Sequence, residues 1–252
     1  MNPYKILTHG FILDKEGKKM SKSLGNVISN QELFDNYPVE AIRYYLLTNT
    51  ILGKDFKFDP DNLINCYNNI LIKDFGNLFQ RLLKIVKPIQ LGLNKYFEAN
   101  LEKIKLKKQK YIQELIKFTN TLDFLEYNNL LSTIITYSNK MLTDKKPWSV
   151  DSIETQVEIL GEIMIDYNIA MCLMYPIIPD KVLELAGYFG LDNKLFLQSN
   201  DLKITISETT NKVIAFVNII KQVVKIEKKS KEEKKKIKKK YKGKIISLLI
   251  LD

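Results

Sequence analysis

Residues 61–87 read DNLINCYNNILIKDFGNLFQRLLKIVK, and they carry the clearest structural pattern in the chain. Large apolar residues recur there at intervals of three or four, which is the repeat of one face of an α-helix. These residues are Leu63, Tyr67, Leu71, Phe75, Leu78, Leu82 and Ile85. Asp59-Pro60-Asp61 comes just before them and is a typical helix start. We therefore predict one long helix over residues 61–87.

Helical periodicity continues toward the C-terminus of the chain. The pattern predicts further helices at about 102–121, 123–143, 152–175 and 179–187. Pro176 and Pro179 interrupt the chain before the last of them. Because long helices joined by short links pack side by side in alternating directions, these segments predict an antiparallel helical bundle.

The residues before the bundle show a different pattern. Residues 5–13 are apolar and compatible with a β-strand, and Asp14-Lys15-Glu16-Gly17 is a turn signal. Ser29 and Asn30 can cap one helix, and Pro38 suits the first turn of a second helix at 38–48. We expect a mainly α protein in which a small α/β region precedes the bundle. The predicted domains are 1–58, 59–198 and a Lys-rich C-terminal extension at 199–252.

Composition narrows the class of protein and of partner. The net charge of +10 and the pI near 9.3 favour a polyanionic partner such as nucleic acid. The two cysteines, Cys66 and Cys172, are far apart, so neither a zinc site nor a disulfide framework is expected. No secretory signal and no run of about twenty apolar residues appears. We expect a cytoplasmic protein, with an organelle as the alternative location, and no segment that crosses a membrane.

Residues 18–26, Lys-Lys-Met-Ser-Lys-Ser-Leu-Gly-Asn, indicate a chemistry. Attack on the α-phosphate of ATP builds negative charge on the phosphoryl oxygens, and ammonium groups placed there lower the barrier. Lys19 and Lys22 supply such charges, Ser21 and Ser23 supply hydroxyl donors, and Gly25 lets the backbone turn. The alternative is a basic surface loop without a function.

The run Lys-Met-Ser-Lys-Ser resembles the second signature of the class I aminoacyl-tRNA synthetases. The resemblance implies that Lys19, Met20, Ser21, Lys22 and Ser23 bind ATP, with Mg²⁺ accompanying it, and that Lys19 and Lys22 are catalytic. The other signature of that family needs a His-x-Gly-His type sequence, and the chain has a single histidine, His9. We interpret His9 as a structural residue in or beside a strand.

Sequence after the loop resembles the methionyl-tRNA synthetases in particular. The matching residues are Arg43-Tyr44-Tyr45-Leu46-Leu47, Gly53-x-Asp55, Asn68, Leu71, Gly76-Asn77-Leu78, Pro147-Trp148 and Pro176-x-x-Pro179. In that family the corresponding bundle binds the CAU anticodon of methionine tRNA. The resemblance implies that Asn77, Arg81 and Trp148 read the anticodon.

The chemistry of these three residues agrees with that role. Asn77 and Arg81 are four apart on one predicted helix, and an amide and a guanidinium can hydrogen-bond the edge of an unstacked base. The indole of Trp148 can stack on a base. Two other interpretations stay open, an exposed helix residue for Asn77 and a core residue for Trp148.

The chain departs from the family pattern at several positions. Ile70 stands where aspartate is usual and Lys73 where asparagine is usual, while Leu195-Phe196-Leu197-Gln198 lacks a Pro-basic pair. About a dozen lysines between residues 225 and 244 form either a non-specific RNA-binding arm or a solvated extension.

The resemblance implies a methionine–tRNA ligase, which uses ATP to form methionyl-adenylate and then charges tRNA(Met). The expected partners are tRNA(Met) and a separate N-terminal catalytic half, without which the isolated chain would be inactive. The alternative is a non-catalytic tRNA-binding module.

Overall fold

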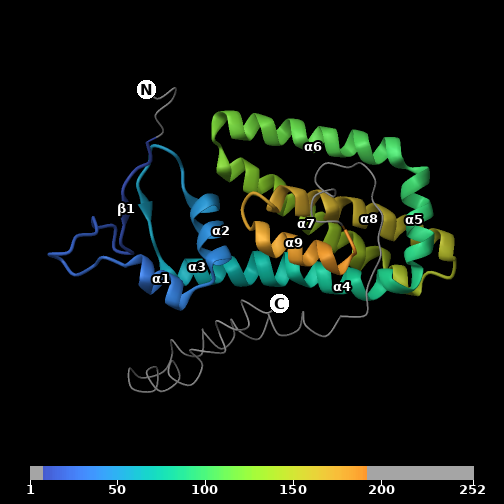
Figure 1. Cartoon of the computed structure of the whole chain (residues 1–252), viewed down its shortest axis with the longest axis horizontal. Helices are drawn as coiled ribbons and strands as arrows, with labels where there is room; N and C mark the ends of the chain where they lie inside the picture. The colour runs from blue at the N-terminus through green and yellow to red at the C-terminus, as the bar shows by residue number, and fades with distance from the viewer. Residues whose placement is uncertain (1–7, 192–252) are drawn as a thin grey trace, which may run out of the picture. The chain divides into compact units, whose positions relative to one another are not determined.

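The computed structural model describes residues 8–191, and helices dominate it (Figure 1). Two short strands, β1 (Ile12–Leu13) and β2 (Phe56–Lys57), pair in parallel, and α1 (Asn30–Asn36) and α2 (Val39–Asn49) lie between them in the sequence. A mainly α chain with a small α/β region at its start is therefore confirmed. Of the strand expected over residues 5–13, only Ile12–Leu13 is a strand within the described range.

Most of the predicted helices occur close to their expected bounds. They are α6 (Leu101–Thr121), α7 (Phe124–Lys145), α8 (Ile153–Met174) and α9 (Pro179–Tyr188). Ser29 caps α1 as expected, because its hydroxyl accepts a hydrogen bond from the Glu32 amide at 3.1 Å. Pro38 is the N-cap of α2 and does not lie in its first turn. None of the helices between residues 8 and 191 combines the length and apolar character that a bilayer span requires.

The prediction of a single continuous α-helix over 61–87 is wrong, because a π-helix interrupts it. The segment consists of α3 (Pro60–Cys66), a π-helix η1 (Tyr67–Gly76) and α4 (Asn77–Val86). Side chains spaced four apart drift steadily around an α-helix, and the wider π turn reverses that drift. Tyr67, Leu71 and Phe75 are therefore all buried. After the π segment the buried face of α4 includes Val86, whereas Ile85 is only half-buried.

Sequence analysis also missed one helix. Residues that were expected to link two long helices form a 3₁₀ turn, η2 (Lys87–Ile89), and then α5 (Gln90–Ala99). Leu93 and Phe97 are fully buried on α5, and α5 packs against α8. Four large apolar residues in ten, Leu91, Leu93, Tyr96 and Phe97, did not distinguish this helix from a loop.

Helix α8 lies at the centre of the bundle and contacts α5, α6, α7 and α9. Fourteen of its residues are buried, which is typical of a helix surrounded on all sides. Its Tyr167 ring stacks on Phe75 with centroids 5.2 Å apart and meets Phe189 edge-on at 6.2 Å. The apolar core therefore joins η1 and the chain after α9 to α8.

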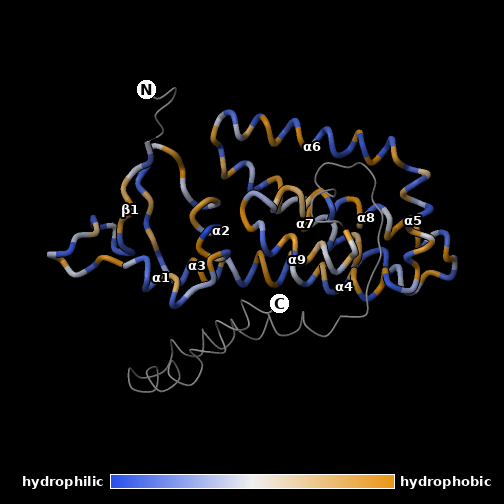
Figure 2. Tube along the Cα trace, viewed as in Figure 1, coloured by the Kyte–Doolittle hydropathy of each residue, from blue (hydrophilic) through white to orange (hydrophobic). Residues whose placement is uncertain are grey.

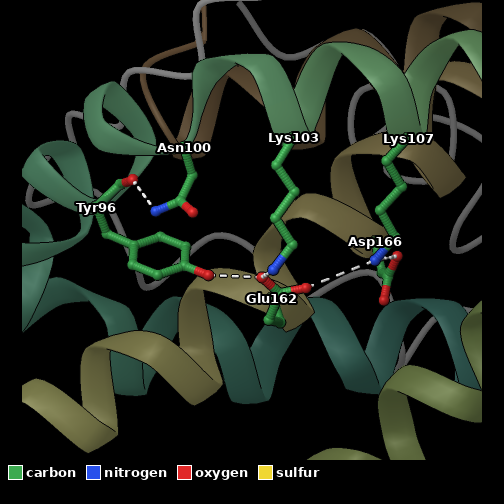
Figure 3. Close-up of polar contacts among 6 residues, drawn as sticks. All are labelled: Tyr96, Asn100, Lys103, Lys107, Glu162 and Asp166. Carbon is green, nitrogen blue, oxygen red and sulfur yellow. Dashed lines mark hydrogen bonds and ion pairs between the residues drawn. The ribbon is translucent and has the colours of Figure 1, made fainter.

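Helix α6 is held to α8 mainly by polar contacts. Only Ile104 and Lys108 are buried on α6, and polar and apolar residues are mixed along it (Figure 2). Glu162 on α8 accepts hydrogen bonds from the Tyr96 hydroxyl at 2.5 Å and the Lys103 ammonium at 2.6 Å (Figure 3). Lys107 forms an ion pair with Asp166, 2.6 Å from Oδ1. Polar side chains from α5, α6 and α8 thus meet in one cluster.

The two carboxyl groups of this cluster have opposite pKa shifts. Burial raises the pKa of Asp166, and its contact with Lys107 does not fully offset that effect. Burial also acts to raise the pKa of Glu162, but hydrogen bonds from Lys103 and Tyr96 and the charge of Lys107 outweigh it and hold the pKa low.

Replacing Gly161 by alanine tests the contact between α5 and α8. A Cβ at this position would lie 2.4 Å from two ring atoms of Tyr96, whose hydroxyl is fixed by Glu162. We expect Gly161→Ala to destabilise the protein by about 1–3 kcal/mol in urea denaturation. The control is Gly187→Ala on α9, where a Cβ meets nothing within 4 Å and a gain of about 0.5–1 kcal/mol is expected. Equal stability of the two variants would show that Tyr96 moves aside freely.

Replacing Glu162 by glutamine tests the polar cluster. Because the pKa of Glu162 is lowered on folding, its contribution is complete above the unfolded value and is lost as pH falls through the folded one. Glu162→Gln should therefore lower the free energy of unfolding by about 1–2 kcal/mol at pH 7, and the difference should shrink below pH about 4.3. Glu98→Gln, at an exposed position on α5, is the control for the lost charge. A pH-independent difference would contradict this account.

Candidate functional site

Residues 13–26 form a hairpin-like loop that projects from β1, at the opposite end from α5 in Figure 1. Leu13 pairs with Lys19 in an antiparallel bridge, and the Asp14 amide donates to the Lys18 carbonyl at 2.9 Å. Gly17 and Gly25 have φ values of 82° and 65°, in the left-handed region that glycine adopts without steric cost. The expected turn at 14–17 is confirmed.

The two lysines expected to be catalytic differ in their surroundings. The Lys19 ammonium lies 4.0 Å from the centroid of the Phe11 ring, which is a cation–π contact. Lys22 is exposed at the outer part of the loop, as is Ser23, whose hydroxyl lies 3.2 Å from that of Ser21. Met20 is half-buried. The loop therefore offers Lys22 and two adjacent hydroxyl groups to a ligand, while Lys19 has a partner within the protein.

Asn26 joins the two ends of the loop. Its side-chain oxygen accepts a hydrogen bond from the Ser21 amide at 2.9 Å, and its nitrogen donates to Asp14 Oδ2 at 2.8 Å and to the Lys19 carbonyl at 3.3 Å. The hydrogen bond from Asn26 is the largest of the effects that lower the pKa of Asp14. Sequence analysis noted Asn26 only as the last residue of the signature, because nothing in the sequence pairs it with Asp14.

The loop is attached to the chain around β2. The Phe11 amide donates to Asp55 Oδ1 at 2.7 Å, and a Cβ at Gly10 would lie 2.2 Å from the Lys54 carbonyl oxygen. The two segments can therefore approach this closely only with glycine at position 10. His9 is exposed and its Nδ1 donates to the Gly10 carbonyl at 2.7 Å.

The structure brings Arg81 and Trp148 together, although they are far apart in the sequence. The Arg81 guanidinium on α4 lies 5.9 Å from the Trp148 ring centroid, and both of its terminal nitrogens lie 3.4 Å from Thr143 Oγ1. Trp148 is 51% exposed, so the interpretation as a core residue is wrong. Pro147 beside it is buried and anchors the 3₁₀ turn η3 (Pro147–Ser149). An exposed indole face next to a guanidinium can hold a flat, electron-rich ring.

Asn77 lies one turn before Arg81 on α4 and is exposed. It is the first residue after the π-helix, and a Cβ at the preceding Gly76 would lie 2.9 Å from the Leu71 carbonyl oxygen. Gly76 therefore permits the π geometry that sets the direction of Asn77 and Arg81. Asn139 on α7 donates to the Asp74 carbonyl at 3.1 Å and fastens the same end of η1.

The two departures from the family pattern lie on the π-helix. Ile70 is half-buried, and the Lys73 ammonium donates to Asn69 Oδ1 at 3.0 Å. Residues 195–198 and the lysines of 225–244 lie outside the described range. Within residues 8–191 no group of three His, Cys, Asp or Glu side chains could hold a metal, and Cys66 and Cys172 do not form a disulfide with each other.

The family model and the relatives that match this chain are all described as tRNA synthetases or tRNA ligases. Residues 1–83 match the family model described as "tRNA synthetases class I (M)". The chain is 37% identical over 164 residues to the methionine–tRNA ligase of Ureaplasma parvum, covering 62% of this chain and 31% of the relative. It is 30% identical, over an alignment of 252 positions, to that of Caldanaerobacter subterraneus, covering 91% and 38%. The chain thus spans about a third of the length of these relatives.

Solved structures show the same fold. The chain is similar to a Mycobacterium tuberculosis methionyl-tRNA synthetase in complex with methionyl-adenylate, with a TM-score of 0.62 and 20% sequence identity. The similarity covers 78% of this chain and 40% of that one.

The contact between Arg81 and Trp148 can be measured directly, because Trp148 is the only tryptophan. Removing the guanidinium uncovers one ring face, so Arg81→Ala should shift the emission to longer wavelength and increase quenching by acrylamide. Stability should change by less than about 0.5 kcal/mol. Lys84→Ala, one turn further along α4, is the matched control and should leave the emission unchanged. Identical spectra of the Arg81→Ala variant and the parent protein would show that the two groups do not meet in solution.

Proposed function

We propose, because the chain is a homologue of the methionine–tRNA ligases, that it supplies the phosphate-binding loop and the anticodon-binding surface of such an enzyme. The reaction joins methionine to AMP with release of diphosphate and then transfers methionine to tRNA(Met). The observation that carries the proposal is the loop at residues 18–26, which lies within the matched segment 1–83 and exposes Lys22.

Each loop residue has a role that follows from its surroundings. Lys22 meets the charge that develops on the phosphates, because its ammonium is exposed at the outer part of the loop. Ser21 and Ser23 offer hydroxyl donors beside it, and Met20 supports the loop from its half-buried position. Lys19 must leave the Phe11 ring to reach a phosphate, so its contribution depends on loop movement. Mg²⁺ would arrive with ATP, bound to the phosphates.

The helices from α3 onward form the proposed anticodon-binding domain, expected over residues 59–198 and described to residue 191. Trp148 would stack on one unstacked base, while Arg81 and Asn77 hydrogen-bond the edges of its neighbours. We place the loop in a first domain, 1–58, and the Lys-rich extension predicted at 199–252 lies outside the described residues. Two separate cysteines that are not joined in a disulfide fit the reducing conditions of the cytoplasm.

Binding of RNA hairpins tests the anticodon surface. Trp148→Ala should weaken binding of a hairpin with the CAU anticodon by about 1–3 kcal/mol, or roughly 5- to 150-fold, because a stacking platform is lost. Arg81→Ala should weaken it as well, and Lys84→Ala is the control for lost charge on the same helix. A hairpin with a changed anticodon should bind weakly to every variant. Unchanged affinity of the Trp148→Ala variant, with unchanged stability, would contradict the assignment.

Methionine-dependent exchange of pyrophosphate into ATP tests the loop. We expect the 252-residue chain alone to show no exchange and a mixture with the nucleotide-binding part of a relative to show it. Lys22→Ala should then depress the rate far more than it raises the KM for ATP, because Lys22 acts on charge in the transition state. Lys15→Ala, in the adjoining turn, is the control. Undiminished exchange in the Lys22→Ala mixture would remove the proposed role of Lys22. Failure of every mixture, with hairpin binding intact, would favour the non-catalytic tRNA-binding module.

A further inference from the structure

We infer that Asp14 and Asn26 form a latch that closes the base of the phosphate-binding loop and positions Lys22. The inference rests on the proposed function, because it assigns positioning residues to the same loop. Neither residue faces a phosphate in this role. Both act through the backbone of residues 19–25.

The latch is a closed set of hydrogen bonds between the two ends of the loop. Asp14 Oδ1 accepts from the Lys18 amide at 2.7 Å, while Oδ2 accepts from the Asn26 side chain at 2.8 Å. The Asn26 oxygen accepts from the Ser21 amide at 2.9 Å. Each oxygen of the carboxylate and the amide oxygen therefore has a distinct donor. Two half-buried side chains, those of Asp14 and Asn26, therefore hold together the two ends of the segment 20–25.

The hydrogen bonds between residues 21 and 25 of the outer loop join these residues only to one another. Within it, the Leu24 and Gly25 amides donate to the Ser21 and Lys22 carbonyls, both at 3.2 Å, which are local turn contacts. Leu24 is 66% exposed and Met20 is only half-buried, so apolar burial contributes little to fixing this segment. The direction of Lys22 consequently depends on the backbone at Ser21, and the backbone at Ser21 depends on Asn26.

Such a latch has a definite value for nucleotidyl transfer. A loop whose ends are fixed needs to order fewer residues when it closes on a triphosphate, so more of the interaction energy remains for the transition state. Breaking the latch should therefore lower kcat more than it raises the KM for ATP.

The chain permits an exchange of the two side chains that distinguishes the latch from general packing. Asp14→Asn alone sets two amide donors against each other, and Asn26→Asp alone sets two carboxylates against each other. The double variant Asp14→Asn/Asn26→Asp restores the pair in reverse, because Asn at 14 can accept from the Lys18 amide and donate to Asp at 26. Aspartate at 26 can still accept from the Ser21 amide. The 3.3 Å contact to the Lys19 carbonyl is the one element that the exchange does not restore, because an oxygen of aspartate at 26 would face that carbonyl in place of the amide donor.

The first experiment uses the full 252-residue chain and limited trypsin digestion, with cleavage after Lys19 and Lys22 measured by mass spectrometry. Each single variant should be cut roughly tenfold faster than the parent protein, and the double variant should return close to the parent rate. Gln31→Ala removes a similar amide–carboxylate contact to Asp35 on α1, and loop cleavage should not change. Inorganic triphosphate should protect Lys22 in the parent protein and the double variant, and less in the single variants. Equal cleavage of all variants, or equal protection, would overturn the latch.

The second experiment measures pyrophosphate exchange in the mixture with the nucleotide-binding part of a relative. The single variants should lose at least tenfold in kcat with a smaller change in the KM for ATP, and the double variant should recover most of the loss. A kcat that stays at the parent value in the single variants would overturn the positioning role. Absence of exchange from the parent mixture would count against the proposed function, whereas the digestion experiment would still decide whether the latch exists.

Discussion

Three consecutive residues on α2 fasten the loop-bearing strands to the helices. Because successive residues on an α-helix point about 100° apart, Arg43, Tyr44 and Tyr45 reach three different parts of the chain. The Arg43 side chain donates to the Ile177 and Pro176 carbonyls at 2.7 and 3.1 Å, and the Tyr44 hydroxyl donates to Asn128 on α7 at 2.6 Å. The Tyr45 ring meets Phe56 and Phe58 edge-on. The position of the loop relative to the bundle depends on this short helix.

Helix α8 imposes the main constraint on the bundle itself. Polar groups on the buried faces of such a helix are costly unless neighbouring helices supply partners for them. Lys107 reaches from α6 to Asp166, and the Tyr127 hydroxyl on α7 donates to the Leu173 carbonyl. These contacts fix the axial positions of α6 and α7 relative to α8 more specifically than apolar packing can. A hydrogen bond is lost when one helix shifts along the other by more than a fraction of an ångström.

The sequence was sufficient to predict what depends on local pattern. Apolar periodicity predicted the long helices, and Gly17 and Gly25 marked two turns that require positive φ. It failed where the deciding contact is remote. Nothing in the sequence around Arg43 indicates its carbonyl partners, because they lie 133 and 134 residues away. The π-helix and the burial of Val86 in place of Ile85 follow from tertiary packing. The Asp14–Asn26 pair forms only because the folded chain brings residue 26 back beside residue 14. For the same reason the sequence named Arg81 and Trp148 but not the Thr143 hydroxyl beside them.

The two candidate sites differ in how firmly they are held, and the difference suits the chemistry proposed for each. Arg81 and Trp148 stand on helices whose other faces are packed, and reading a base edge needs donors fixed to within a fraction of an ångström. Lys22 stands on an exposed loop, and a point charge acts on phosphates over several ångströms in many orientations. A loop that must admit ATP and release diphosphate also has to move. What such a loop needs from the fold is a fixed base, and in this structure the base consists of β1, β2 and the hydrogen bonds of Asp14 and Asn26.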